Sequence, residues 1–185
     1  MLTLVLSIIG VVTGFAGLML HFYKFIGERP KLRIHTKYEN GKVYFDANQH
    51  IDKIQSPMRL IIYANIENPS DKPLTITEFT FKSEVLDKPL SSQFGIEPSD
   101  NYEFAAPDGT IWGINAKSKH LPNMTEIKGR SAVEGFIFFP FCPCIQLDSI
   151  NGTLCVCTPC KTFKKKVTLH LTHSVRPLLK NTIQI

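Results

Sequence analysis

The first 23 residues of this 185-residue chain contain no charged side chain, because all 21 Lys and Arg residues and all 16 Asp and Glu residues follow Tyr23. The chain also has no low-complexity tract and no internal repeat, which excludes fibrous and solenoid architectures. It contains no GxSxG, P-loop or GxGxxG motif, so these signatures of hydrolases and nucleotide-binding proteins are absent. What is present is 43% apolar and 20% charged, the composition of a globular protein with an uncharged head.

The uncharged head is long enough to cross a membrane. As a helix, 23 residues extend roughly 34 Å, against a hydrocarbon core of about 30 Å. Aromatic residues and the first cation follow in the segment 21–25 (HFYKF), as expected at headgroup depth. A cleaved signal peptide and a buried soluble helix are the alternatives. The head has neither the basic start nor the small-x-small cleavage site of a signal peptide, so a retained transmembrane helix is predicted.

Charges on the two sides of the head predict its orientation. Lys24, Arg29, Lys31 and Arg33 follow the apolar run against the single acidic Glu28, whereas only the amino terminus precedes it. The positive-inside rule therefore places the body in the cytoplasm. The same four cations are candidates for contact with anionic lipid at the membrane surface.

Small residues recur along one face of the predicted helix, at Ser7, Gly10, Gly14 and Gly17. Gly10 and Gly14 form a GxxxG motif, which lets two helix backbones approach closely. The stripe predicts contact with a second copy of the chain or with another membrane protein.

The remainder of the chain has the period-two pattern of β-strands. The sequence divides into a membrane helix with its interfacial edge (1–26), a linker (27–31) and a β-domain (32–185). Strands are expected over 31–38, 43–46, 58–68, 74–82, 111–114, 132–141, 167–173 and 182–185. The segment 58–68 alternates most clearly, and the parity of the apolar residues shifts between Ile76 and Phe79, which indicates a bulge. This pattern predicts an all-β fold, a sandwich of about seven or eight strands after one helix.

Several motifs carry a resemblance of layout. A single membrane helix and a proline-containing linker precede the turn NPSDKPLTI at 68–76, which is followed by Leu121-Pro122, the segment IKGRS at 127–131 and the strand at 135–139. Together they resemble membrane-tethered immunoglobulin-like domains of bacterial proteins of unassigned function. The resemblance covers most of the chain and implies a binding or structural module, but it carries over no functional residue.

All five cysteines lie within 19 residues, at Cys142, Cys144, Cys155, Cys157 and Cys160. Between them, Asn151-Gly152 is a hairpin signal, so a cysteine-rich hairpin is predicted at 140–160. A two-residue turn there would gather four thiols on one face, with Cys160 beyond the end, whereas a shift of one residue would place the two pairs on opposite faces. Three interpretations stay open: a structural zinc site, two disulfides with one remaining thiol, or reduced cysteines with a redox-responsive pair. No cofactor is predicted with certainty, and zinc is the one considered.

These patterns favour a non-enzymatic, single-pass membrane protein. Its β-sandwich would act as a protein-interaction module at the membrane surface, with membrane lipid and either a protein partner or a second copy as the expected contacts. A zinc-binding or redox-responsive sensor that uses the cysteines is the alternative. A second basic run, Lys161 and Lys164–Lys166, could also face lipid, and because no recognised motif accompanies the charge, nucleic acid is not an expected partner.

Overall fold

The computed structural model describes residues 2–36, 42–46, 58–92, 101–105, 111–115, 118–143, 145 and 147–174. These residues form one helix, α1 (Leu2–Glu28), followed by strands only. The strands are β1 (Arg33–His35), β2 (Lys42–Asp46), β3 (Met58–Asn68), β4 (Leu74–Ile76), β5 (Glu78–Lys82), β6 (Leu90–Ser91), β7 (Asn101–Ala105), β8 (Ile111–Asn115), β9 (Thr125–Ile127), β10 (Ser131–Cys142), β11 (Ser149–Cys157), β12 (Thr162–Leu171) and β13 (His173–Ser174). The predicted strand at 182–185 lies outside the described residues.

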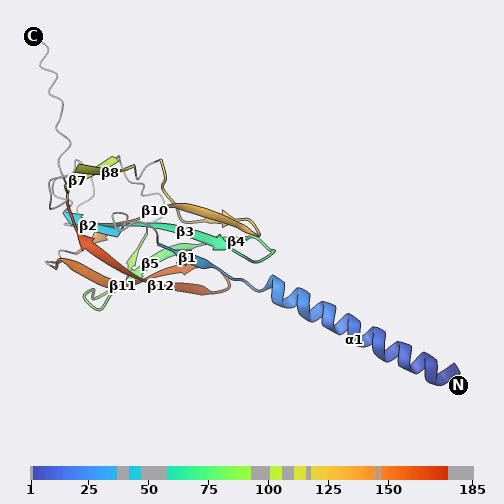
Figure 1. Cartoon of the computed structure of the whole chain (residues 1–185). Coiled ribbons are helices and arrows are strands. Elements are labelled where there is room, and N and C mark those ends of the chain that lie inside the picture. The colour runs from blue at the N-terminus through green and yellow to red at the C-terminus, as the bar shows by residue number, and fades with distance from the viewer. Residues whose placement is uncertain are drawn as a thin grey trace, which may run out of the picture.

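Most strands belong to one eight-stranded sheet, in the order β1-β3-β2-β12-β11-β5-β6, with β10 paired to β3. All of its pairings are antiparallel except that of β2 with β12. Two smaller antiparallel sheets, β13-β7-β8 and β4-β9, complete the body (Figure 1). The predicted class, a mostly β protein with one N-terminal helix, is therefore confirmed.

Strand β3 lies at the centre of this arrangement and is buried on both faces. Its alternation predicted one apolar and one polar face, and the apolar side chains Leu60, Ile62 and Ile66 do lie in the main core. The opposite face is also covered, however, because Ile61 is fully buried and Tyr63 packs edge-on against Phe136 of β10 at 4.8 Å. The polar Arg59 is fully buried as well, whereas Asn65 and Glu67 near the end of the strand are half-buried.

The parity shift after Ile76 marks a change of sheet. Strand β4 pairs with β9, whereas β5, only one residue further along the chain, pairs with β11. Thr77, between them, donates its backbone N–H to the carbonyl of Cys157 at 2.8 Å. The predicted irregularity is therefore the point at which the chain leaves one sheet and joins the next.

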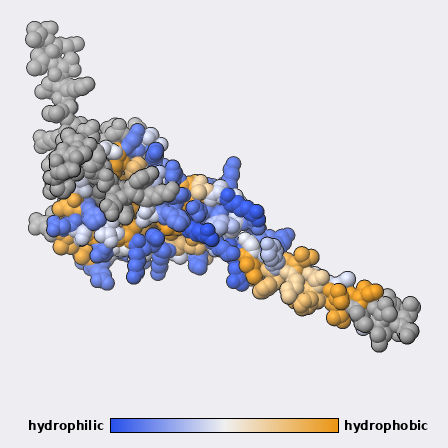
Figure 2. Space-filling model, in the orientation of Figure 1, coloured by the Kyte–Doolittle hydropathy of each residue, from blue (hydrophilic) through white to orange (hydrophobic). Residues whose placement is uncertain are grey.

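Helix α1 projects from the body as a separate rod (Figure 1). Its segment Ile9–Glu28 is long and apolar enough to span a membrane, and none of it is buried against the protein. Large apolar side chains such as Val11, Leu18 and Leu20 are about 70% exposed, and Figure 2 shows this apolar rod against a largely hydrophilic body. The helix is thus not a core element of the β-body, and its exposure is compatible with single-pass membrane anchoring, although a signal sequence has the same length and composition.

Candidate functional site

Two turns at the end of the body nearest α1 are joined through the side chain of Asn68. This side chain is 1% exposed and donates hydrogen bonds to the carbonyls of Lys72, Ile127 and Lys128 at 2.8, 3.1 and 3.2 Å. Its oxygen accepts from the backbone N–H of Ser70 at 3.1 Å and from the Ser70 hydroxyl. One amide therefore satisfies groups of both turns, and we call residues 68–73 and 127–131 together the two-turn clasp.

The clasp is closed by a close backbone approach at Gly129. A Cβ atom on Gly129 would lie 2.1 Å from the carbonyl oxygen of Asp71, so only glycine fits. The next residue, Arg130, has a φ of 54° and donates its backbone N–H to the carbonyl of Ser70 at 3.0 Å. The left-handed conformation turns the chain sharply into β10 and directs Arg130 toward the first turn.

Ion pairs connect the clasp internally and to the end of α1. Lys72 Nζ lies 2.7 Å from Glu28 Oε2 on the helix. Within the clasp, Arg130 Nε donates to Asp71 Oδ1 at 2.6 Å. The other carboxylate oxygen of Asp71 faces Gly27, where a Cβ would lie 3.2 Å from it. The helix therefore ends against a surface of the β-body that ion pairs hold in place.

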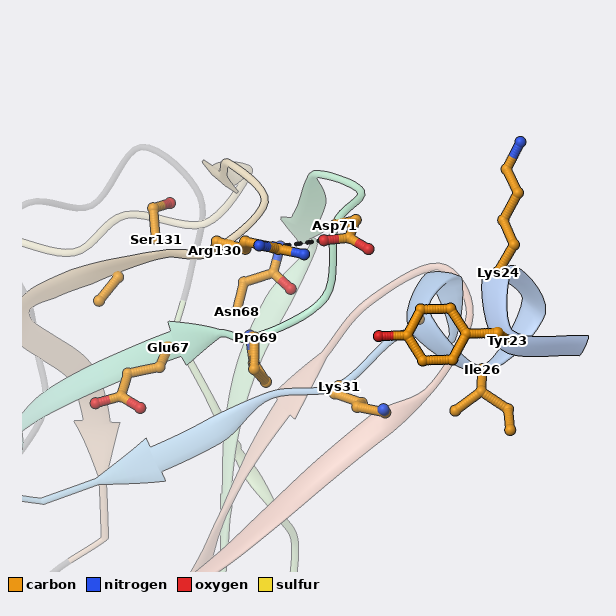
Figure 3. Close-up of a pocket in the computed structure, with 12 residues that line it drawn as sticks. Tyr23, Lys24, Ile26, Lys31, Glu67, Asn68, Pro69, Asp71, Arg130 and Ser131 are labelled. Carbon is orange, nitrogen blue, oxygen red and sulfur yellow. Dashed lines mark hydrogen bonds and ion pairs between the residues drawn. The ribbon is translucent and has the colours of Figure 1, made fainter. Parts of the chain in front are cut away.

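A cavity of about 820 Å³ lies between the end of α1 and the two-turn clasp. Figure 3 shows the Tyr23 ring turned from the helix toward the clasp, and Lys31 reaching back from the linker toward the helix. Its lining residues include three cations, two carboxylates and several apolar or aromatic groups: Tyr23, Lys24, Ile26, Gly27, Lys31, Glu67, Asn68, Pro69, Asp71, Arg130, Ser131 and Ala132. The cavity is thus amphipathic and sits where the predicted membrane segment ends.

The structure places the four cations predicted for the membrane surface in three settings. Lys24 and Lys31 line the cavity. Arg29 stacks over the Phe25 ring at 4.8 Å. Arg33 lies in β1 opposite Glu67 of β3, so it belongs to the body.

Sequence reasoning missed the contribution of the clasp to this site. Asp71, Lys72 and Arg130 come from turns at least 40 residues beyond the helix, and only the strand pairing of β3 with β10 brings these turns together. The turn motifs NPSDKP and KGR were visible in the sequence, but nothing in their spacing showed that they meet.

The small-residue face of α1 is open along its length. A Cβ added at Gly10, Gly14 or Gly17 would meet no atom within 4 Å, and Ser7 is exposed. The hydroxyl of Thr13 donates to the carbonyl of Ile9 at 2.8 Å, within the helix. The stripe predicted for helix–helix contact is therefore accessible to a second helix.

The predicted cysteine hairpin at 140–160 does not form. Cys142 ends β10, which pairs with β3, whereas Cys155 and Cys157 lie in β11, which pairs with β5 and β12. Asn151-Gly152 lies within β11 rather than in a turn. The reason is that Gly152 accommodates the ring of Phe81, whose Cζ would be 2.2 Å from a Cβ at this position. The hairpin that does form joins β11 to β12 through residues 158–161, where Thr158 donates to the carbonyl of Lys161 at 3.0 Å.

The described cysteines differ in burial as well as in their positions in the fold. Cys142 and Cys155 are buried, Cys157 is half-buried and Cys160 is exposed. Cys144 lies outside the described residues. Over the part of the chain that the structure describes, no three His, Cys, Asp or Glu side chains are grouped so that they could hold a metal ion.

Comparison with known proteins leaves the family open. No protein-family model matches the chain, and no curated protein matches it. Among solved structures, one described only as a Northeast Structural Genomics Consortium target aligns with 82% of this chain and 89% of its own, at 10% identity and a TM-score of 0.23. A likeness of this size establishes neither a shared fold nor a function.

Proposed function

We propose that the protein is a single-pass membrane protein whose β-domain is a non-enzymatic protein-interaction module held at the membrane surface. The observation that carries this proposal is the projection of a long, largely exposed apolar helix from a hydrophilic body. Burial of such a helix in lipid removes its large apolar surface from water, at about 25 cal/mol per Å².

The two-turn clasp supports a fixed presentation of the β-domain. The Lys72–Glu28 ion pair ties the clasp to the helix end, and a linker of only four residues separates α1 from β1. A domain attached in this way keeps one end toward the bilayer and offers its distal surface to a partner. A long flexible tether would leave the domain free to tumble.

The open small-residue face of α1 supports assembly within the membrane. Gly10, Gly14 and Gly17 leave room for a second backbone, and helix association in lipid depends on such close packing. The partner of this face is a second copy of the chain or another membrane helix.

The finer fold that we propose is an immunoglobulin-like sandwich variant. Its support is that β3 and β10 share one core with β5, β11 and β12, through side chains such as Leu60, Ile137, Phe79 and Leu154. Layers of antiparallel strands around one apolar core are the general plan of such sandwiches. The parallel pairing of β2 with β12 departs from a purely antiparallel plan.

Small-to-large substitutions test the helix contact. Gly10→Ile together with Gly14→Ile is expected to shift the full-length protein from oligomer to monomer in mild detergent, or to abolish cross-linking to its membrane partner. Ala16→Ile adds comparable bulk on the opposite side of α1 and is the matched control. Unchanged association of the double variant would contradict the proposed contact, and extraction of the wild-type protein by carbonate would contradict membrane anchoring.

Cys160 offers a native probe of orientation, because it is exposed in the β11–β12 turn. We expect a membrane-impermeant maleimide to label this thiol only after cells or vesicles are opened, since the charge bias places the body in the cytoplasm. Cys160→Ser removes the labelled site and is the control. Labelling of intact cells at Cys160 would reverse the proposed orientation.

A further inference from the structure

We propose that the cavity between the end of α1 and the two-turn clasp binds the headgroup of an anionic phospholipid. This inference rests on the membrane anchoring proposed above and adds a specific ligand site to it. It is argued from the depth of the cavity, its charges and its apolar walls.

The depth of the cavity matches that of lipid headgroups. The uncharged head ends at Tyr23, and a helix of 23 residues extends roughly 34 Å, enough to cross the hydrocarbon core of about 30 Å. Tyr23 is 81% exposed at the end of this head, as aromatic side chains are at a membrane interface. Because Tyr23, Lys24 and Gly27 line the cavity, it opens where phosphate groups lie.

The charges of the cavity favour an anion. Its two carboxylates are each close to a basic group: Asp71 accepts from Arg130 at 2.6 Å, and Glu67 lies 3.7 Å from His35 Nε2. Lys31 supplies a further ammonium group, which reaches from the linker toward the helix, whereas Lys24 lines the cavity from the helix with its ammonium group directed away from the clasp (Figure 3). Arg130 is 79% exposed and uses only its Nε in the bond to Asp71, so its terminal N–H groups face the surroundings as donors.

The walls of the cavity favour a lipid over free phosphate. Tyr23, Ile26 and Pro69 place aromatic and aliphatic surface beside the cations (Figure 3). A phospholipid has the same division, with an anionic phosphate next to an apolar glycerol ester and acyl chain. Inorganic phosphate would use only the cations and leave the apolar wall without a contact.

The test measures which lipids remain on the full-length protein after reconstitution. The wild-type chain is placed in bilayers of phosphatidylcholine with phosphatidylglycerol, and bound lipids are counted by native mass spectrometry after mild release. We expect phosphatidylglycerol to be retained in preference to phosphatidylcholine. Lys24→Gln together with Lys31→Gln is expected to lower that preference about fivefold for each lysine removed.

Lys82→Gln together with Lys88→Gln is the matched control, because both residues are exposed on β5 and the loop after it and do not line the cavity. Equal loss in this control, no preference in the wild-type protein, or full displacement of the lipid by millimolar inorganic phosphate would overturn the lipid site. Retention of the wild-type protein in carbonate-washed membranes with no lipid preference would overturn this inference alone. Extraction by carbonate would overturn the membrane anchoring as well.

Discussion

The two-turn clasp brings together residues that are far apart in the sequence, whereas the cysteine segment separates residues that are close in the sequence. The five cysteines occupy 19 consecutive residues, yet of those described Cys142 ends β10, Cys155 and Cys157 lie in β11 and Cys160 lies in the turn after it, and they range from buried to exposed. The clasp joins turns that are almost 60 residues apart, through one buried amide and a backbone contact. In a sheet, partners are chosen by strand pairing, so closeness along the chain is a poor guide to which side chains meet.

The two regions also differ in what holds them. In the clasp, Asn68, Gly129 and the Arg130 backbone are each required by a specific hydrogen bond or approach distance. The cysteines contribute mainly as small side chains, with Cys142 in the apolar core and Cys157 accepting a weak contact from the Thr162 hydroxyl at 3.8 Å. Four predictions test this contrast, from the largest expected effect to the smallest.

Thiol reactivity should separate the cysteines by burial. We expect Cys160 to react with a maleimide in the native protein, and Cys142 and Cys155, each 1% exposed, to react about a thousandfold more slowly, because modification requires unfolding. The measurement is peptide mass spectrometry after timed labelling. Equal rates at the three sites would show that the segment is an open cluster, and labelling in denaturant provides the control for intrinsic reactivity.

Gly129→Ala should strongly destabilise the β-body. The new Cβ would overlap the Asp71 backbone, which cannot move as a side chain tip can, so we expect a loss of about 3 kcal/mol in the free energy of unfolding. Denaturant unfolding of the detergent-solubilised protein, followed by Trp112 fluorescence, measures it. Gly17→Ala, where a Cβ meets nothing within 4 Å, is the control. Equal stability of the two variants would contradict the close approach.

Asn68→Ala should cost about 2 kcal/mol of unfolding free energy. It removes three donated hydrogen bonds and leaves carbonyls at the base of the clasp without this partner. Asn151→Ala is the matched control, because Asn151 is exposed and its side-chain oxygen accepts a bond from the Thr168 hydroxyl at 2.7 Å. If both variants lose the same stability, Asn68 is not the centre of the clasp.

The Arg130–Asp71 pair should contribute least. Its side chains are 79% and 51% exposed, so solvent screens the charges and we expect a coupling of about 0.5 kcal/mol. A double-mutant cycle with Arg130→Ala and Asp71→Ala measures this coupling at low and high salt. A coupling above 2 kcal/mol would show that the clasp is stabilised mainly by this ion pair rather than by Asn68 and Gly129.

Strand identity was predictable where the local pattern was strong. The alternation over 58–68 and the apolar run over 132–141 correspond to β3 and β10, and the parity shift after Ile76 corresponds to the break between β4 and β5. Asn151-Gly152 led to the wrong prediction of a turn, because this dipeptide occurs both in tight turns and inside strands. It suits a tight turn, but here glycine is needed in a strand interior so that the Phe81 ring can lie against the backbone.

Of the candidate site, only the residues at the end of the helix and in the linker could be predicted from the sequence. Lys24, Arg29 and Lys31 follow the apolar head directly, so their place at the end of the helix is a consequence of order along the chain. Lys72 and Arg130 reach the same place because β3 and β10 pair in register from Ser131↔Asn68 onward. No local pattern in the turns encodes that pairing.

The sequence by itself determined a long uncharged helix, a cationic edge beside it and a β-rich body, because composition and residue order decide these features locally. Only the tertiary structure decided that two distant turns close around Asn68, that a cavity forms between them and α1, and that the cysteines separate. The physical reason is that strand register and backbone contact distances depend on the packing of the whole core, in which each pairing is selected against all others.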